Sequence, residues 1–94
     1  MAEEKFRCLF SLGMLCSTPL ALELVGMEQI RDALVRHIQG DWGEVCKDDW
    51  QSNDEAVKEG TRLLSAYTSK EGNKFWIITE ADRSVTTVLM PEEY

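Results

Sequence analysis

The sequence has few of the residues from which disulfide frameworks and metal sites are built. It contains three cysteines, Cys8, Cys16 and Cys46, and a single histidine, His37. An odd number of widely spaced cysteines is not typical of a disulfide framework and fits a reducing compartment. These four residues could in principle form a Cys₃His zinc site, but no cysteine pair has the short C-x₂-C spacing. We therefore expect no bound metal and no cofactor.

Long apolar runs are also missing. Residues 6–25 are rich in apolar side chains, but polar and charged residues interrupt them, so no stretch of about 18 apolar residues could span a membrane. Glu3 and Glu4 precede Lys5, so the positive start of a secretory signal is absent. We expect a cytoplasmic protein that does not associate with membranes.

Basic residues are outnumbered. The chain has 17 acidic and 10 basic residues and a formal net charge of −7. Such a surface repels phosphate backbones, which disfavours direct nucleic-acid binding. Two interpretations stay open: the charge keeps the protein soluble, or it matches a protein partner with a basic surface.

The length limits what the chain can enclose. Residues 1–94 make a single domain, and a chain of this size buries roughly 60–65% of its unfolded surface. One sheet and two or three helices fit, whereas a deep substrate cavity does not. This disfavours a self-contained enzyme, although an active site could be shared across a dimer.

The first third of the chain carries strand and helix signals. Apolar and polar residues alternate over 5–12, which predicts a strand. Thr18 can cap a short helix that begins at Pro19 and ends at Gly26.

Two further helices are predicted in the middle of the chain. An apolar stripe with spacings of three and four predicts a helix over 27–39. A thinner stripe predicts a polar helix over 47–59. Ser52 and Glu55 also have the spacing of a capping box, so this helix could instead begin at Asn53.

The last third changes to period-two alternation. Three segments alternate, near 63–67, 75–80 and 85–90, and a glycine-containing loop and a polar turn separate them. They predict a three-stranded antiparallel meander, whose edge the N-terminal strand joins. The fold class is therefore α+β, with an antiparallel sheet of three or four strands and two or three helices on one face.

Two groups of polar residues could carry chemistry. In the turn 80–84, Arg83 could hold a carboxylate or phosphate with Glu80 as a base. Alternatively, Asp82 caps the turn and Arg83 pairs with Glu80 in solvent. His37 could be a general base or a ligand, or it could simply favour the negative end of its helix.

The densest acidic stretch lies between residues 41 and 55. It is either a solvated helix face or a docking surface for a basic protein. Gly40 and Gly43 flank Trp42, and a loop of this kind does not easily bury so large a ring, so we expect Trp42 to be an exposed anchor. The alternative is that Trp42 covers the end of the core. We predict a partner-binding surface made of Asp41, Trp42, Glu44, Asp48, Asp49, Glu55, Glu80, Asp82 and Arg83.

Two stretches carry a resemblance to a known family. They are "SLGMLCSTPLALELV" at 11–25 and the segment from "GDWGEVC" to "LMPEEY" at 40–94, which includes "WIITEADRS". The chain resembles small proteins of plasmids, prophages and other bacterial mobile elements, often labelled plasmid-related proteins. The match covers nearly the whole chain, and it departs from the family at Leu20, where glycine is usual, and at Cys16, where a small residue is usual. The resemblance implies a prokaryotic, mobile-element origin and no particular activity.

These observations favour a binding role. Small acidic proteins of mobile elements often act on host proteins, so we expect a non-enzymatic protein, monomeric or homodimeric, that inhibits a host defence complex such as a CRISPR effector or a restriction enzyme through its acidic surface. The alternative is a small-ligand-binding or catalytic module that uses the 80–84 hairpin and His37. A third possibility is a transcription cofactor that dimerises through an exposed edge strand.

Overall fold

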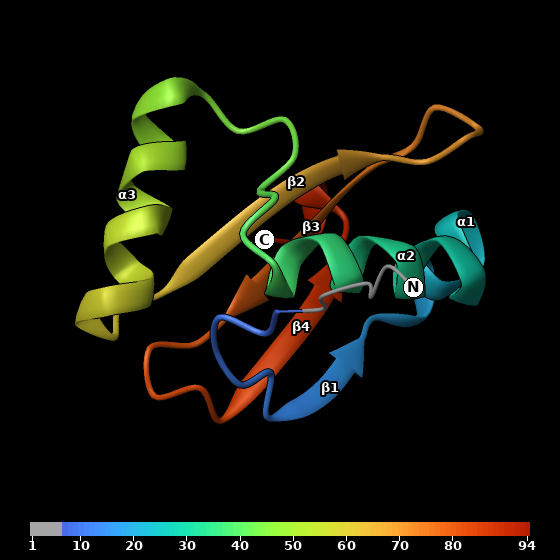
Figure 1. Ribbon diagram of the computed structural model, residues 1–94. Coiled ribbons are helices and arrows are strands. Elements are labelled where there is room, and N and C mark those ends of the chain that lie inside the picture. The colour runs from blue at the N-terminus through green and yellow to red at the C-terminus, as the bar shows by residue number, and fades with distance from the viewer. Residues whose placement is uncertain (1–6) are drawn as a thin grey trace, which may run out of the picture.

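The fold is a four-stranded sheet with three helices, an α+β arrangement as the sequence predicts (Figure 1). The computed structural model describes residues 7–94. In chain order its elements are β1 (Met14–Ser17), α1 (Pro19–Val25), α2 (Met27–Ile38), α3 (Lys47–Glu59), β2 (Leu63–Thr68), β3 (Lys74–Thr79), β4 (Val85–Leu89) and a 3₁₀ turn, η1 (Pro91–Glu93).

The sheet is mixed. Its strand order is β1-β4-β3-β2, and β2, β3 and β4 form the antiparallel meander expected from their alternation. β1 joins the edge next to β4, but it runs parallel to β4, with Met14 opposite Val85 and Ser17 opposite Val88. The expectation of a purely antiparallel sheet is therefore wrong.

The N-terminal strand lies later in the chain than predicted. Residues 5 and 6 fall outside the described part of the chain, and residues 7–13 are not a strand, so the prediction over 5–12 is wrong. The break is Gly13, which has a φ of +66°. A side chain at Gly13 would collide with the carbonyl oxygens of Arg83 and Ser84, so only glycine can pass this point. Regular pairing with β4 begins immediately afterwards.

The apolar residues before Gly13 have a different role from strand pairing. The backbone N–H of Leu9 donates to the carbonyl of Ile38 at 2.9 Å. The ring of Phe10 stacks on that of Trp42, with centroids 6.1 Å apart. The alternating residues 7–14 therefore belong to two different structures: a coil that packs on the end of α2 and the start of β1.

The three helices lie close to where the sequence predicts them. Thr18 caps α1 by accepting a hydrogen bond from the N–H of Ala21 at 3.1 Å, and Pro19 takes the first position. α3 begins at Lys47, so the alternative start at Asn53 is wrong. In Figure 1, α1 and α2 lie over one side of the sheet, and α3 stands beside the start of β2. Within residues 7–94, no helix combines the length and apolarity needed to cross a bilayer.

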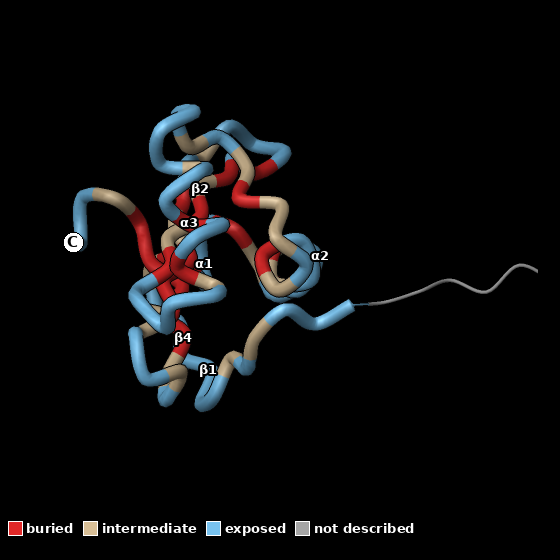
Figure 2. The backbone as a smooth tube through the Cα atoms, turned by 60° about the vertical axis from the view of Figure 1, so that its left-hand side comes forward, coloured by how far each residue is buried: buried red, intermediate tan, exposed pale blue. Residues whose placement is uncertain are grey.

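Two apolar clusters hold these elements together. The larger lies between α1, α2 and the sheet, and Figure 2 shows β4 largely buried there while β1 beside it is exposed. The smaller fixes α3 to the start of β2. Its buried members are Trp42, Ala56 and Leu63, and the side chains packed against them are Phe10, Val45, Trp50 and Val57.

Candidate functional site

His37 belongs to a chain of hydrogen bonds between buried polar side chains. Its side chain points from α2 into the sheet, where Nδ1 lies 2.6 Å from Ser65 Oγ and Nε2 lies 2.9 Å from Thr79 Oγ1. Thr79 Oγ1 lies 2.8 Å from Thr86 Oγ1, which in turn donates to the carbonyl of Leu12 at 2.7 Å. The chain therefore links α2, β2, β3, β4 and the segment before β1.

The carbonyl at one end fixes the direction of every proton. A carbonyl oxygen can only accept, so the hydroxyl of Thr86 donates its hydrogen to the Leu12 carbonyl. The oxygen of Thr86 must then accept a hydrogen bond from the hydroxyl of Thr79. Thr79 must then accept from Nε2–H of His37, and in a neutral ring Nδ1 accepts from the hydroxyl of Ser65. His37 is thus the neutral Nε2–H tautomer.

Burial and charge favour the same neutral form. The imidazole is 0% exposed. Desolvation, with a smaller contribution from the charge of Arg83, lowers the pKa of His37 to about 3. A Ser–His pair of this spacing could serve in nucleophilic catalysis, but Ser65, Thr79 and Thr86 are also 0% exposed, so no substrate reaches them in this conformation.

The sequence indicated His37 but not its partners. The structure places His37 on the buried side of α2 with Ile30 and Ala33, so it does more than favour the helix end. One feature of the sequence could have indicated a partner for His37. Ser65 alternates with Leu63 and Tyr67, which places its hydroxyl on the same, buried face of β2. A hydroxyl at an inward position needs a partner, and His37 supplies it.

Arg83 is engaged by backbone carbonyls. Its guanidinium donates to the carbonyls of Thr61 at 2.6 Å, Ala56 at 2.9 Å and Glu80 at 3.2 Å. Its backbone has a φ of 61°, in the left-handed region. Arg83 therefore ties the last turn of α3 to the β3–β4 turn, through bonds from both of its terminal nitrogens to backbone carbonyls.

The two carboxylates of the same turn do not converge on Arg83. Asp82 is exposed and caps the turn by accepting from the N–H of Ser84 at 3.0 Å. Ser84 lowers the pKa of Asp82, first through its side chain and second through its backbone N–H. The carboxylate of Glu80 faces Arg62 at 4.0 Å, and both side chains are nearly half exposed. Arg83 contacts Glu80 through its carbonyl, so the expected side-chain pair between them is wrong.

Trp42 is buried, so the expectation of an exposed anchor is wrong. The ring is 0% exposed, and its Nε1–H donates to Asp54 at 3.0 Å. The glycine-flanked loop can bury it because backbone bonds hold the loop to β2: Ala66 N–H donates to the Trp42 carbonyl at 3.1 Å and Glu44 N–H donates to the Ala66 carbonyl at 2.7 Å. The alternative, that Trp42 covers the end of the core, is confirmed.

Asp41 is only partly available to a partner. Its carboxylate pairs with Arg36, with Nε 2.8 Å from Oδ2, and accepts from the N–H of Gly43. These contacts lower the pKa of Asp41, the Arg36 hydrogen bond most strongly.

The outer side of α3 is strongly acidic. Its 13 residues include five carboxylates and two lysines, all exposed. The buried side holds the helix in place, because Asn53 donates to the carbonyl of Leu64 at 2.8 Å and accepts from its N–H at 3.2 Å. The acidic surface of α3 consists of Asp48, Asp49, Asp54, Glu55 and Glu59.

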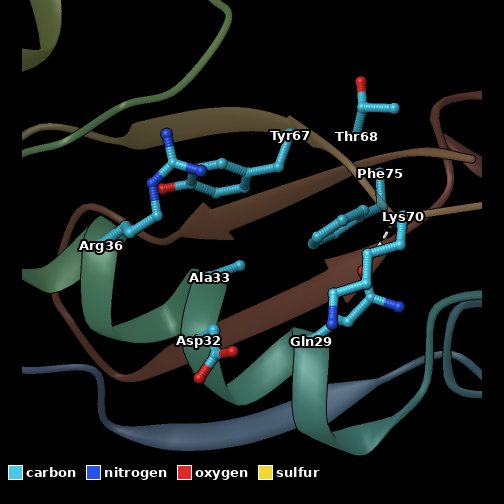
Figure 3. A pocket seen from close by; sticks show the side chains of 8 residues that line it. All are labelled: Gln29, Asp32, Ala33, Arg36, Tyr67, Thr68, Lys70 and Phe75. Carbon is cyan, nitrogen blue, oxygen red and sulfur yellow. Dashed lines mark hydrogen bonds between the residues drawn. The ribbon is translucent and has the colours of Figure 1, made fainter. Parts of the chain in front are cut away.

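A shallow hollow of about 130 Å³ lies between α2 and the β2–β3 hairpin (Figure 3). The guanidinium of Arg36 covers the ring of Tyr67, 4.7 Å from its centroid. Gln29 accepts from the N–H of Lys70 at 2.8 Å. Ligand pockets of drug-sized molecules are typically about 300–1,000 Å³, so this hollow is small for an organic substrate.

The cysteines are dispersed over the surface. Cys8, Cys16 and Cys46 are free and exposed. Among residues 7–94, no three His, Cys, Asp or Glu side chains are grouped so that they could hold a metal ion.

Comparison with protein-family models, curated proteins and solved structures finds no match to this chain.

Proposed function

We propose that this chain is a non-enzymatic binding protein of a mobile element, which inhibits a host defence complex such as a CRISPR effector or a restriction enzyme. In this proposal the acidic surface of α3 covers a basic region of the partner that would otherwise hold nucleic acid. Complementary charge speeds the encounter and selects the partner.

The observation that supports the proposal most directly is the separation of two roles on α3. Asn53 and Ala56 face inward and fix the helix, while the five acidic residues are exposed; Oδ1 of Asp54 in addition accepts from Nε1–H of the buried Trp42. A fixed helix presents its charges at constant spacing, which lowers the entropy lost on binding.

The partner-binding surface is smaller than the sequence suggested. Trp42 is buried, Arg83 is occupied by three carbonyls and Asp82 caps its own turn. The proposal therefore rests on Glu44 and on the acidic surface of α3.

A charge-reversal experiment tests the proposal. The triple variant Asp48→Lys, Asp49→Lys, Glu55→Lys is compared with wild type for binding to a purified RNA-guided nuclease and a purified restriction endonuclease. Affinity should fall steeply between about 0.05 M and about 0.5 M salt, and the reversal should abolish most of the low-salt binding.

The matched control reverses three exposed carboxylates elsewhere, Glu23→Lys, Glu28→Lys and Glu92→Lys, which changes the net charge equally. Circular dichroism confirms that both variants keep their helices. An affinity that does not change with salt concentration, or that falls equally in both variants, contradicts the proposal.

The alternative function, a ligand-binding or catalytic module built on the 80–84 hairpin and His37, is less well supported. His37 lies inside the core, and Arg83 binds the backbone of α3. A ligand there would have to displace contacts that stabilise the fold.

A further inference from the structure

The two edges of the sheet differ in how far other protein groups bond their backbone. At the β2 edge, the side chain of Asn53 bonds both the N–H and the C=O of Leu64. Further along, the loop from Trp42 to Glu44 bonds both backbone groups of Ala66. Protein groups thus take the place of a neighbouring strand along this edge.

The β1 edge has no such cover within residues 7–94, where β1 pairs with β4 alone. Met14 N–H donates to Ser84 at 2.9 Å and Thr18 N–H donates to Val88 at 3.0 Å. Backbone groups alternate in direction along a strand, so those of Leu15 and Ser17 point away from the sheet. The strand reads Met-Leu-Cys-Ser, without the lysine, proline or bulge that commonly protects an edge.

An apolar groove runs alongside this edge. It consists of three adjoining hollows of about 280, 310 and 170 Å³ between β1 and α2, all of which share Leu15 and Leu34. Leu15 is 54% exposed and Met27 63% exposed. Among residues 7–94, Arg31 is the one charged residue that lines these hollows, although the chain carries a net charge of −7.

We infer that the free edge of β1 pairs with β1 of a second copy of this chain, in antiparallel orientation about a twofold axis. With the axis at Cys16, Leu15 of each copy lies opposite Ser17 of the other. These pairs exchange four backbone hydrogen bonds, the most that the outward groups of β1 can form. The two sheets become one, and both of its outer edges are the covered β2 edges.

The chemistry of the face favours a second copy over a basic partner. An incoming strand must place an apolar side chain on the α2 side, and Leu15 does this, because it shares that side with buried Thr86 and Val88 of β4. Among residues 7–94, no acidic side chain lines the groove, so repulsion between the acidic charges of two copies is small there, and a basic partner would find no complementary charge and would face Arg31.

Sedimentation velocity over a range of concentrations tests the dimer. We expect a species of twice the 10.7 kDa chain mass. Leu15→Lys should weaken the dimer about tenfold or more, because it places a charge at the edge and in the groove. Leu24→Lys is the matched control, since Leu24 is a partly exposed leucine of α1 outside the groove lining, and it should leave the dimer unchanged. A monomer at all concentrations up to about 1 mM, the weak end of specific association, overturns the inference.

Thiol cross-linking tests the register. In this register Cys16 lies opposite Cys16 of the second copy, at a non-hydrogen-bonded position. Cα atoms at such a position are about 4.5 Å apart, a distance that a disulfide can span. Diamide takes two electrons and two protons from the two thiols and becomes a hydrazine. A chain with Cys8→Ser and Cys46→Ser should form a covalent dimer rapidly.

Two control chains define the background. A chain that keeps only Cys46 reports random collisions between exposed thiols. A chain with Cys16→Ser and Ser17→Cys as its single thiol places the Cα atoms of the two cysteines on a diagonal of about 7–8 Å, too far apart for a disulfide without backbone movement. Cross-linking at Cys16 no faster than at Cys46 rejects pairing through β1, and faster cross-linking from position 17 rejects this register.

Discussion

Nε2 of His37 lies 2.9 Å from Oγ1 of Thr79, and this contact joins α2 to the centre of the sheet. Both groups are 0% exposed, so neither can exchange its partner for water. Directional bonds of this kind fix the position of α2 over the sheet more narrowly than apolar packing does, because an unpaired buried polar group costs about 1–3 kcal/mol.

Thr86→Val removes one hydroxyl from the buried chain without changing its shape. It leaves the Leu12 carbonyl and the Thr79 hydroxyl without their partner, so we expect a loss of about 1–3 kcal/mol in the free energy of unfolding. Thr87→Val, the same change at the next residue on the open face of the sheet, should change it by less than about 0.5 kcal/mol. Urea unfolding measures both, and equal effects would contradict the assigned role of Thr86.

The tautomer of His37 is directly measurable, because the chain has a single imidazole. We expect one protonated nitrogen, Nε2, and an Nδ1 of pyridine type in ¹⁵N-detected NMR spectra at pH 7. The resonances should not titrate between about pH 8 and about pH 5, since the pKa of His37 is lowered to about 3. A titration midpoint near 6.5, the ordinary histidine value, would show that the ring is solvated.

The same pKa predicts how stability depends on pH. The unfolded chain takes up a proton on His37 as the pH falls below 6.5, whereas the folded chain does so only near 3. Above 6.5 both states are neutral and stability is complete; it is lost as the pH falls from 6.5 toward 3, with a slope approaching about 1.4 kcal/mol per pH unit.

The control for this slope is His37→Gln, which has no titratable ring. It should be less stable at pH 7, but its stability should stay nearly flat between pH 6.5 and about 5, above the range in which carboxylates titrate. Parallel curves for the two proteins would assign the slope to other groups.

Arg83→Lys tests whether the guanidinium holds α3 to the β3–β4 turn. An ammonium cannot reach three carbonyls in the same geometry, so we expect a loss of about 1–3 kcal/mol in the free energy of unfolding. Arg62→Lys is the control, because its contact with Glu80 is 4.0 Å and half exposed, and it should cost less than about 0.5 kcal/mol. Hydrogen exchange of the last turn of α3 should rise only in the Arg83 variant.

Gly43→Ala tests the loop that covers the β2 edge. Gly43 has a φ of +76°, and a side chain there would collide with the Ala66 carbonyl and the Tyr67 ring. Gly60 has nearly the same φ, +74°, but nothing within 4 Å. Both substitutions cost about 1–2 kcal/mol of backbone strain, and Gly43→Ala should cost about 1–3 kcal/mol more. Similar thermal unfolding midpoints for the two variants would mean that the loop is held loosely.

Local sequence determined most of the secondary structure. α1 follows from Thr18 and Pro19, and α2 follows from its apolar stripe, because capping and helical periodicity act within a few residues. The three strands of the meander follow from alternation and short turns for the same reason.

Tertiary structure decided what depends on residues distant in the chain. The carbonyls of Arg83 and Ser84 make Gly13 a break, so β1 begins at Met14 and pairs in parallel with a strand about 70 residues away. The backbone of Ala66 anchors the loop that buries Trp42, and the sequence around Trp42 carries no sign of that partner.

The sequence by itself determined the three helices, the three strands of the meander and the acidic outer side of α3, because periodicity, caps and charge are properties of neighbouring residues. Only the tertiary structure decided that His37 meets Ser65 and Thr79, that Arg83 binds a carbonyl of α3, and that β1 pairs with β4 alone among residues 7–94. Hydrogen bonds and packing join whichever groups the fold brings within about 3–4 Å, and that distance is set by the whole chain.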